Sequence, residues 1–218
     1  MAYQYLDIPE IRPEFVNNAR LFANRVEMIK NLGIPQGSSI AEIGVANGDF
    51  TERLITELKP SHFFAADLFE MEKFPMHWGI PSEILFRGKT HFDFFKDRFS
   101  HVADRMTILR GFSSDTLPTI EDRSLDMIYI DAAHDYKNVS SDGAVCANKV
   151  KNNGILIFND YLLFDPFINA EYGVVPAVNE MLATGEWQVI GFALQRHMFC
   201  DIAIRRTGTE ETASSREA

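Results

Sequence analysis

Acidic and amide side chains stand at the ends of several short apolar runs of this chain: Glu42, Asp67, Asp131, Asn159 and Asp160. Carboxylates accept strong, charge-assisted hydrogen bonds from hydroxyl groups, and carboxylate and amide oxygens together suit a hard cation such as Mg²⁺. If the apolar runs are parallel strands of one sheet, these side chains gather at its carboxyl edge, where open α/β sheets bind ligands. Their types and positions therefore predict a ligand site at that edge.

A glycine-containing turn follows the first of these runs, over residues 42–48. Such a turn lets the backbone approach a ligand closely, because glycine has no Cβ and adopts positive φ angles easily. The spacing differs from the Gly-x-Gly-x-x-Gly of dinucleotide-binding folds, which argues against an NAD-dependent reductase. Instead, Glu-x-Gly-x-x-x-Gly resembles the first motif of class I methyltransferases that use S-adenosylmethionine. The resemblance implies cofactor contacts from Glu42, Gly44, Val45, Asn47 and Gly48.

Further cofactor contacts are expected at the ends of two later strands. Asp67 lies 19 residues after Gly48 and is placed to accept hydrogen bonds from both hydroxyls of a ribose. Leu68 is placed to cover an adenine ring, and Phe112 and Ser113 to offer a backbone N–H and a hydroxyl near its edge. Asp67 and Ser113 also suit helix N-caps, so a purely structural role stays open for both.

A second motif lies between residues 125 and 161. A strand followed by Asp131-x-x-His134-x-Tyr, a helix, and then Gly-x-x-x-x-Asn159-Asp160-Tyr resembles bacterial metal-dependent O-methyltransferases of the macrolide sugar type. It is similar, more distantly, to catechol O-methyltransferase. The resemblance implies Asp131, Asn159 and Asp160 as metal ligands, with His134 and Asp131 as catalytic residues and Asp131 also contacting the cofactor. Those relatives usually carry Asp-Asp where Asn159-Asp160 stands, which removes one negative charge from the site.

The resemblance assigns His134 the role of general base, and an ordinary histidine pKa near ~6.5 suits proton removal at neutral pH. The two motifs predict a magnesium-dependent O-methyltransferase that uses S-adenosylmethionine and acts on a small hydroxylated acceptor, such as a sugar or a secondary metabolite. Two alternatives stay open. One is a metal-independent small-molecule methyltransferase, and the other is a protein that binds S-adenosylmethionine without catalysis.

Strands that alternate with helices predict a Rossmann-like α/β methyltransferase fold. We expect a seven-stranded, mostly parallel sheet with helices on both faces and an antiparallel last strand. Near-continuous apolar runs are typical of strands that are buried on both faces. The expected strands cover residues 38–43, 62–67, 106–109, 125–130, 154–158, 187–192 and 199–204.

We expect a single methyltransferase domain over residues 1–206. Residues 1–37 are predicted to form an N-terminal helical segment, because apolar residues between 16 and 29 repeat at helical spacing. Residues 68–95 contain prolines, glycines and many aromatic residues, which indicates an insertion or lid. Residues 207–218 are polar and predicted to be a disordered tail.

The composition is that of an ordinary globular protein, with 46% hydrophobic and 24% charged residues. The net charge of -10 argues against nucleic-acid binding, which depends on lysine and arginine to neutralise phosphates. Cys146 and Cys200 lie far apart in apolar settings, so we expect buried thiols in a reducing compartment. Since no apolar run is long enough for a membrane span, we predict a cytoplasmic protein without a membrane partner. A homo-oligomer is an open expectation, because the relatives often associate.

Overall fold

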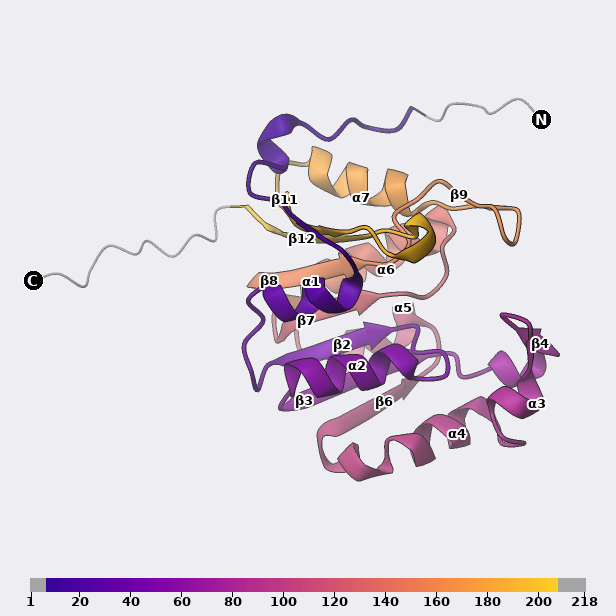
Figure 1. Cartoon of the computed structure of the whole chain (residues 1–218). Helices are drawn as coiled ribbons and strands as arrows, with labels where there is room; N and C mark the ends of the chain where they lie inside the picture. The colour runs from indigo at the N-terminus through magenta and orange to yellow at the C-terminus, as the bar shows by residue number, and fades with distance from the viewer. Residues whose placement is uncertain (1–6, 208–218) are drawn as a thin grey trace, which may run out of the picture.

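The central strands are built from near-continuous apolar runs, as a sheet covered on both faces requires. In the computed structural model, which describes residues 7–207, the main sheet has eight strands in the order β1-β11-β12-β8-β7-β2-β3-β6 (Figure 1). The strands of this sheet run parallel except β12, which is antiparallel to both of its neighbours. This arrangement confirms the predicted Rossmann-like α/β fold with an antiparallel last strand. The strands of the sheet are β1 (Arg20–Phe22), β2 (Ser39–Ile43), β3 (His62–Asp67), β6 (Met106–Arg110), β7 (Leu125–Ile130), β8 (Val150–Phe158), β11 (Trp187–Ala193) and β12 (Asp201–Arg206).

Helices cover both faces of the sheet (Figure 1). Side chains alternate between the two faces along a strand, so Ile43 of β2 packs with α6 whereas Glu42 lies under α2. Helices α1, α2 and α4 lie on the Glu42 face, and α6 and α7 lie on the other. The helices are α1 (Arg25–Asn31), α2 (Asp49–Leu58), α3 (Ser82–Leu85), α4 (His91–Arg98), α5 (Ser113–Thr116), α6 (Tyr136–Lys149) and α7 (Val174–Ala183).

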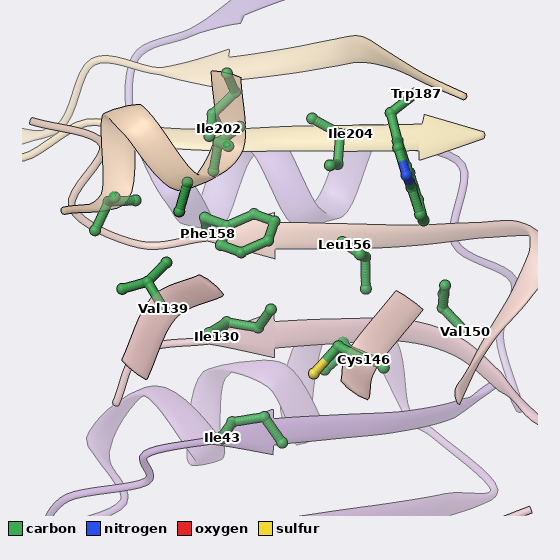
Figure 2. Packing of buried hydrophobic residues seen from close by; sticks show 14 of the residues in the cluster. Ile43, Ile130, Val139, Cys146, Val150, Leu156, Phe158, Trp187, Ile202 and Ile204 are labelled. Carbon is green, nitrogen blue, oxygen red and sulfur yellow. The ribbon is translucent and has the colours of Figure 1, made fainter. Parts of the chain in front are cut away.

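The core beneath α6 fixes the ends of three central strands. Figure 2 shows Ile43, Ile130 and Phe158, the last residues of β2, β7 and β8, beside Val139 and Cys146 of α6. Each of these five side chains is at most 4% exposed. Burial of one such large apolar side chain stabilises the fold by about 1.5–3 kcal/mol. The polar residues that follow these strands directly are therefore held in place at the edge of the sheet.

The N-terminal segment differs from the prediction. The helix expected from residue 16 onward begins only at Arg25, where the Asn24 side chain accepts a hydrogen bond from the N–H of Glu27 (3.0 Å). Residues 20–22 form β1 instead, a parallel edge strand beside β11, so the sheet has eight strands where seven were expected. The reason is tertiary: β11 offers backbone hydrogen-bonding groups at the edge of the sheet, and Phe22 is buried there.

Residues 68–95, predicted as an insertion or lid, have a packed part and an exposed part. Phe69, Phe86 and Phe95 are fully buried (0% exposed) and pack around α4. The hairpin of β4 (Met76–His77) and β5 (Ile80–Pro81) carries Trp78, which is 71% exposed. The packed part anchors the segment to the domain, while closure of the hairpin over the site stays a prediction.

No helix within residues 7–207 has both the length and the apolar character that crossing a bilayer requires. The predicted disordered tail lies outside the described residues except for Thr207. The N–H of Thr207 donates a hydrogen bond to the carbonyl oxygen of Glu186 (2.8 Å), which ends the last strand.

Candidate functional site

Steric contact locks the glycine turn between β2 and α2. Gly44 has a φ of +85°, and a Cβ atom placed on it would lie 2.1 Å from the carbonyl oxygen of Asp131. Gly48 also has a φ of +85°, and a Cβ atom there would lie 2.5 Å from the ring of Phe99. Packing alone therefore requires glycine at both positions. The turn is in close contact with Asp131, the residue that follows β7.

Asp67 closes the same turn from the end of β3. Its Oδ2 accepts hydrogen bonds from the N–H groups of Val45 (2.9 Å) and Ala46 (3.2 Å). Its Oδ1 accepts one from the N–H of Phe69 (2.7 Å). The carboxylate therefore lies beside the predicted cofactor loop, as expected, and it caps backbone groups of that loop rather than a helix.

Two other predicted cofactor residues make contacts inside the protein. Glu42 is 1% exposed and accepts a hydrogen bond from the hydroxyl of Thr51. Burial raises the pKa of the Glu42 carboxyl well above its ordinary range. The Asn47 amide donates to Asp49 at 2.9 Å. Glu42 thus joins β2 to α2 beneath the turn, and its carboxyl is buried there.

Helix α4 holds the turn from its other side, a feature that sequence analysis missed. The Nε2 atom of His91 lies 2.5 Å from the carbonyl oxygen of Ala46, and its Nδ1 lies 3.5 Å from the N–H of Met71. Since a carbonyl oxygen only accepts and an N–H only donates, Nε2 of His91 donates to Ala46 and Nδ1 accepts from Met71. Arg98 donates to the carbonyl oxygen of Asn47 at 2.7 Å. The backbone of the turn is therefore hydrogen-bonded to two side chains of α4.

The residues predicted to contact adenine lie at the ends of the neighbouring strands β3 and β6. The N–H of Gly111 donates to the last carbonyl oxygen of β3 at 3.0 Å, which joins the two strand ends. Leu68 and Phe112 are 41% and 63% exposed, so the two ends present apolar side chains to solvent. The hydroxyl of Ser113 instead donates to the carboxylate of Asp142 on α6. The apolar pair suits the faces of a flat ring, whereas the Ser113 side chain serves helix packing.

The structure brings Asp131, His134 and Asp160 together at the ends of β7 and β8. Nε2 of His134 lies 3.7 Å from Oδ1 of Asp131 and 3.6 Å from Oδ2 of Asp160. The imidazole stacks on the ring of Tyr172, with centroids 4.6 Å apart and planes 16° apart. The Nε2 atom is buried and has no hydrogen-bond partner within residues 7–207. A buried polar atom of this kind commonly meets a ligand, an ion or a water molecule.

Burial sets the proton affinities of these three groups. It lowers the pKa of His134 below its ordinary value of 6.5, so the imidazole is neutral at pH 7. Burial raises the pKa of Asp131 well above 3.8, although the charge of Arg25 opposes this rise. Burial and the negative charge of Asp201 raise the pKa of Asp160 to about 7. The site thus places a neutral imidazole between two carboxyl groups whose pKa values are raised.

A buried hydrogen-bond network behind Asp131 was not predicted. Nη1 of Arg25 donates to the hydroxyl of Tyr129 (3.1 Å) and lies 3.5 Å from Oδ2 of Asp131. The Tyr129 hydroxyl donates to Oδ2 of Asp201 (2.5 Å), and the amide of Asn159 donates to Oδ1 of Asp201 (3.1 Å). Asp201 is 0% exposed, so these bonds compensate its lost hydration. The sequence feature that could have identified Asp201 is an acidic residue at the start of an apolar strand. No sequence feature marked Arg25 as part of the site.

The predicted magnesium ligands lie close to one another. The carboxylates of Asp131 and Asp160 approach each other around His134. The Asn159 amide donates an N–H to Asp201, and its oxygen remains as an acceptor. No group of three or more His, Cys, Asp or Glu side chains in the described part of the chain could hold a metal ion, and an amide ligand such as Asn159 falls outside that set. Magnesium binding therefore stays a prediction.

Comparison with solved structures supports the fold. A Staphylococcus aureus protein assigned as a caffeoyl-CoA O-methyltransferase aligns with a TM-score of 0.56 and 16% identity, covering 91% of this chain and 86% of its own. A type 11 methyltransferase assigned in Sulfolobus solfataricus gives 0.56 and 14%, covering 89% and 99%. The Bacillus subtilis m1A22 tRNA methyltransferase TrmK gives 0.55 and 15%, covering 86% and 67%. A search of curated proteins gave no match.

A family-level comparison identifies the chain more closely. The sequence profile described as Methyltransferase domain matches residues 41–161, which is more than half of the 218 residues. The matched region runs from the glycine turn, through Asp67 and the Asp131–His134 segment, to Asn159 and Asp160. The chain therefore belongs to the methyltransferase domain family and is an S-adenosylmethionine-dependent methyltransferase.

Proposed function

We propose that this protein transfers the methyl group of S-adenosylmethionine to a hydroxyl group of a small molecule, with His134 as general base. The observation that carries the proposal is the Nε2 atom of His134, which has no hydrogen-bond partner within residues 7–207 and lies between Asp131 and Asp160 beside the glycine turn. A neutral imidazole whose Nε2 atom is available is suited to accept a proton. In their ionised form, the two carboxyl groups at 3.6–3.7 Å stabilise the imidazolium that forms.

The chemical step needs a free face of this imidazole. Because Nε2 is covered in the described structure, the acceptor must displace a covering group, and apo geometry of a catalytic base is often looser than that of the complex. Nε2 removes the hydroxyl proton while the oxygen forms a bond to the sulfonium methyl carbon. The carbon–sulfur bond breaks, its electron pair stays on sulfur, and S-adenosylhomocysteine leaves. The fold contributes mainly by holding donor and acceptor in line.

The surroundings of the site favour a partly apolar acceptor. The hairpin β4–β5 and the hairpin of β9 (Phe164–Asp165) and β10 (Ala170–Glu171) extend from the same side of the sheet (Figure 1). Each presents a large exposed side chain, Trp78 (71% exposed) on the first and Phe167 (72% exposed) on the second. The net charge of -10 makes a nucleic-acid acceptor unfavourable. A hydroxylated sugar or secondary metabolite with an apolar portion is the acceptor class that we propose.

Two forms of the reaction differ in their need for a cation. The magnesium-dependent form, implied by the resemblance of the second motif, would use the side-chain oxygens of Asp131, Asn159 and Asp160. The metal-independent form relies on His134 and on the two carboxyl groups that lie 3.6–3.7 Å from its Nε2 atom. Turnover that is indifferent to EDTA would favour the metal-independent form, whereas loss in EDTA and recovery with magnesium would favour the other.

One experiment tests the proposed activity itself. Purified protein is incubated with S-adenosylmethionine carrying an isotopic methyl label and with a panel of hydroxylated sugars, phenols and secondary metabolites. We expect label on an acceptor oxygen, identified by NMR of the product. Label on nitrogen or carbon would contradict oxygen specificity. Calorimetric binding of S-adenosylhomocysteine without transfer to any acceptor would instead support a non-catalytic binding protein.

A further inference from the structure

Arg25 places a permanent positive charge beside the acidic groups of the site. Its Nη1 atom contacts the Tyr129 hydroxyl at 3.1 Å and Oδ2 of Asp131 at 3.5 Å. Its guanidinium lies over the ring of Phe50, 4.0 Å from the centroid, so an aromatic face supports the charge. The side chain is 31% exposed, which makes this a partly desolvated cation rather than a surface arginine.

The charge of Arg25 acts on four acidic groups of this region. It opposes the rise in pKa that burial causes in Glu42, Asp131, Asp160 and Asp201. Tyr129, Asp131 and Asp201 keep the pKa of Arg25 above its ordinary value, although burial acts in the opposite direction. Since a planar guanidinium does not lose its proton in proteins, this compensation is present at all working pH values.

The contacts of Asp131 divide its two oxygens between two partners. Oδ2 faces Arg25, and Oδ1 faces Nε2 of His134 at 3.7 Å. Arg25 is held in turn by the Tyr129 hydroxyl, which donates to Asp201 and also accepts a hydrogen bond from Asn159 at 3.3 Å. Asn159 is thus part of the support for Arg25, in a position where the resemblance of the second motif implies a metal ligand.

We propose that Arg25 is the resident cation of this site: it takes the charge-balancing role of a divalent metal and positions Asp131 beside His134. The effect of Arg25 on catalysis rests on the proposed function. The charge balance between Arg25 and the acidic groups does not depend on that function. Arg25 is a positioning residue in this scheme, because it reaches His134 only through Asp131. A guanidinium that already pairs with Asp131 competes with any divalent cation for that carboxylate.

Metal binding tests the charge balance without reference to activity. Mn²⁺ is titrated into the full-length protein without cofactor, and free Mn²⁺ is followed by electron paramagnetic resonance. We expect no saturable one-to-one binding to the wild type at submillimolar Mn²⁺. Arg25→Met should bind Mn²⁺ at least about tenfold more tightly, since removing the cation leaves Asp131 uncompensated. Stoichiometric binding to the wild type that Arg25→Met does not strengthen would overturn the proposal.

Kinetics test the positioning role, with Arg20→Met as a matched control. Arg20 also lies over an aromatic ring, that of Phe22 at 5.0 Å, and donates to the carbonyl oxygen of Asn31. We expect Arg25→Met to lower kcat by about 100-fold with little change in acceptor KM, because a misplaced catalytic group lowers the rate of the chemical step. Arg25→Lys should recover part of this loss, and Arg20→Met should match the wild type.

The outcomes separate this proposal from the proposed function. If the wild type methylates no acceptor, the proposed function fails, while the Mn²⁺ titration of wild type and Arg25→Met still decides the charge balance. If Arg25→Met does not fold, Arg25→Gln replaces it in both measurements, because it also removes the positive charge. Unchanged kcat in Arg25→Met and Arg25→Lys, or a loss in the first that Lys does not reduce at all, would overturn the positioning role.

Discussion

Gly44 lies against Asp131 so closely that a Cβ atom on the glycine would be 2.1 Å from the Asp131 carbonyl oxygen. The N–H of Asp131 also donates to the carbonyl oxygen of Ile43 at 2.7 Å, so β2 and β7 stay joined beyond their last ladder residues. The turn expected to hold the cofactor and the segment expected to hold the base therefore share one contact. A change in either is transmitted to the other through rigid backbone.

This contact predicts that Gly44→Ala is far more harmful than an alanine at another left-handed glycine. Gly79 is the matched control, because its φ is +79° and nothing lies within 4 Å of a Cβ atom there. Gly79→Ala should cost about 1–2 kcal/mol of unfolding free energy, the cost of the left-handed backbone alone. Gly44→Ala should exceed that cost by at least about 2 kcal/mol, since backbone must also move. Denaturant unfolding of both variants measures the difference, and equal losses would show that the contact is relieved without cost.

Asp67→Ala should weaken S-adenosylhomocysteine binding by at least about tenfold, because two effects combine. The variant loses a candidate ribose acceptor, and it also releases the N–H groups of Val45 and Ala46 in the glycine turn. Isothermal calorimetry measures the dissociation constant, with the exposed Asp104 replaced by alanine as a control for the loss of one surface charge. Wild-type affinity in Asp67→Ala would remove Asp67 from the cofactor site.

His134→Ala should reduce turnover by at least about 100-fold, the usual contribution of a general base, and leave cofactor affinity nearly unchanged. His101, an exposed histidine that follows α4, provides the control substitution His101→Ala. Turnover is measured under saturating S-adenosylmethionine, and cofactor affinity is measured by calorimetry. Normal turnover in His134→Ala would exclude His134 from the mechanism.

The pH dependence of kcat/KM should show an acidic limb that belongs to His134. Burial lowers the pKa of this imidazole below 6.5, and only its neutral form accepts a proton. Activity should therefore rise with pH through a midpoint below about 6.5. A profile with no midpoint below about 6.5 would contradict the assignment. In His134→Ala the residual activity should lack this limb.

Asp160→Asn should stabilise the protein at high pH. The folded-state pKa of Asp160 is raised from 3.8 to about 7, so its favourable contribution is complete below pH 3.8 and is lost as pH rises through about 7. An amide has no such loss, and Asn tolerates the φ of +54° at this position. We expect the variant to gain more than about 1.4 kcal/mol over the wild type on going from pH 4 to pH 8, the free energy of one pKa unit.

Denaturant unfolding in the presence of EDTA measures this gain without a contribution from divalent cations. Asp126→Asn, at a carboxylate that pairs with Lys151 at 2.7 Å, is the control for the loss of one negative charge outside the site. An Asp160→Asn variant whose stability relative to wild type is constant with pH would contradict the raised pKa.

The sequence predicted the central strands well because near-continuous apolar runs must be buried on both faces of a sheet. It failed at β1, where the spacing of apolar residues between 16 and 29 favoured one helix. Leu21 of this strand is 67% exposed, so no pattern of burial distinguishes the segment locally. Its strand conformation depends on pairing with Gly191 and Phe192, about 170 residues away in the chain.

The grouping of candidate residues could be predicted where they follow strands, whereas contacts that cross the fold could not. Asp131, His134 and Asp160 lie together because strand ends meet at one edge of a parallel sheet. Arg25 comes from α1, and its contact with Asp131 spans 106 positions of sequence. The contact of the Asn159 amide nitrogen with Asp201 depends on β12 lying next to β8. Neither contact can be recognised from the residues that neighbour it in the sequence.

The bonds from α4 to the glycine turn have a mechanical consequence. Nε2 of His91 contacts the Ala46 carbonyl oxygen, and the imidazole ring packs against Phe69 and Phe86 of the neighbouring segment. The ring centroids are 4.9 Å apart in each pair. Displacement of that segment strains the loop on which the donor molecule is expected to rest. A ligand that binds to the loop and favours the packed position of the segment is itself bound more tightly when the segment is packed. The free energy of this coupling is the same in both directions.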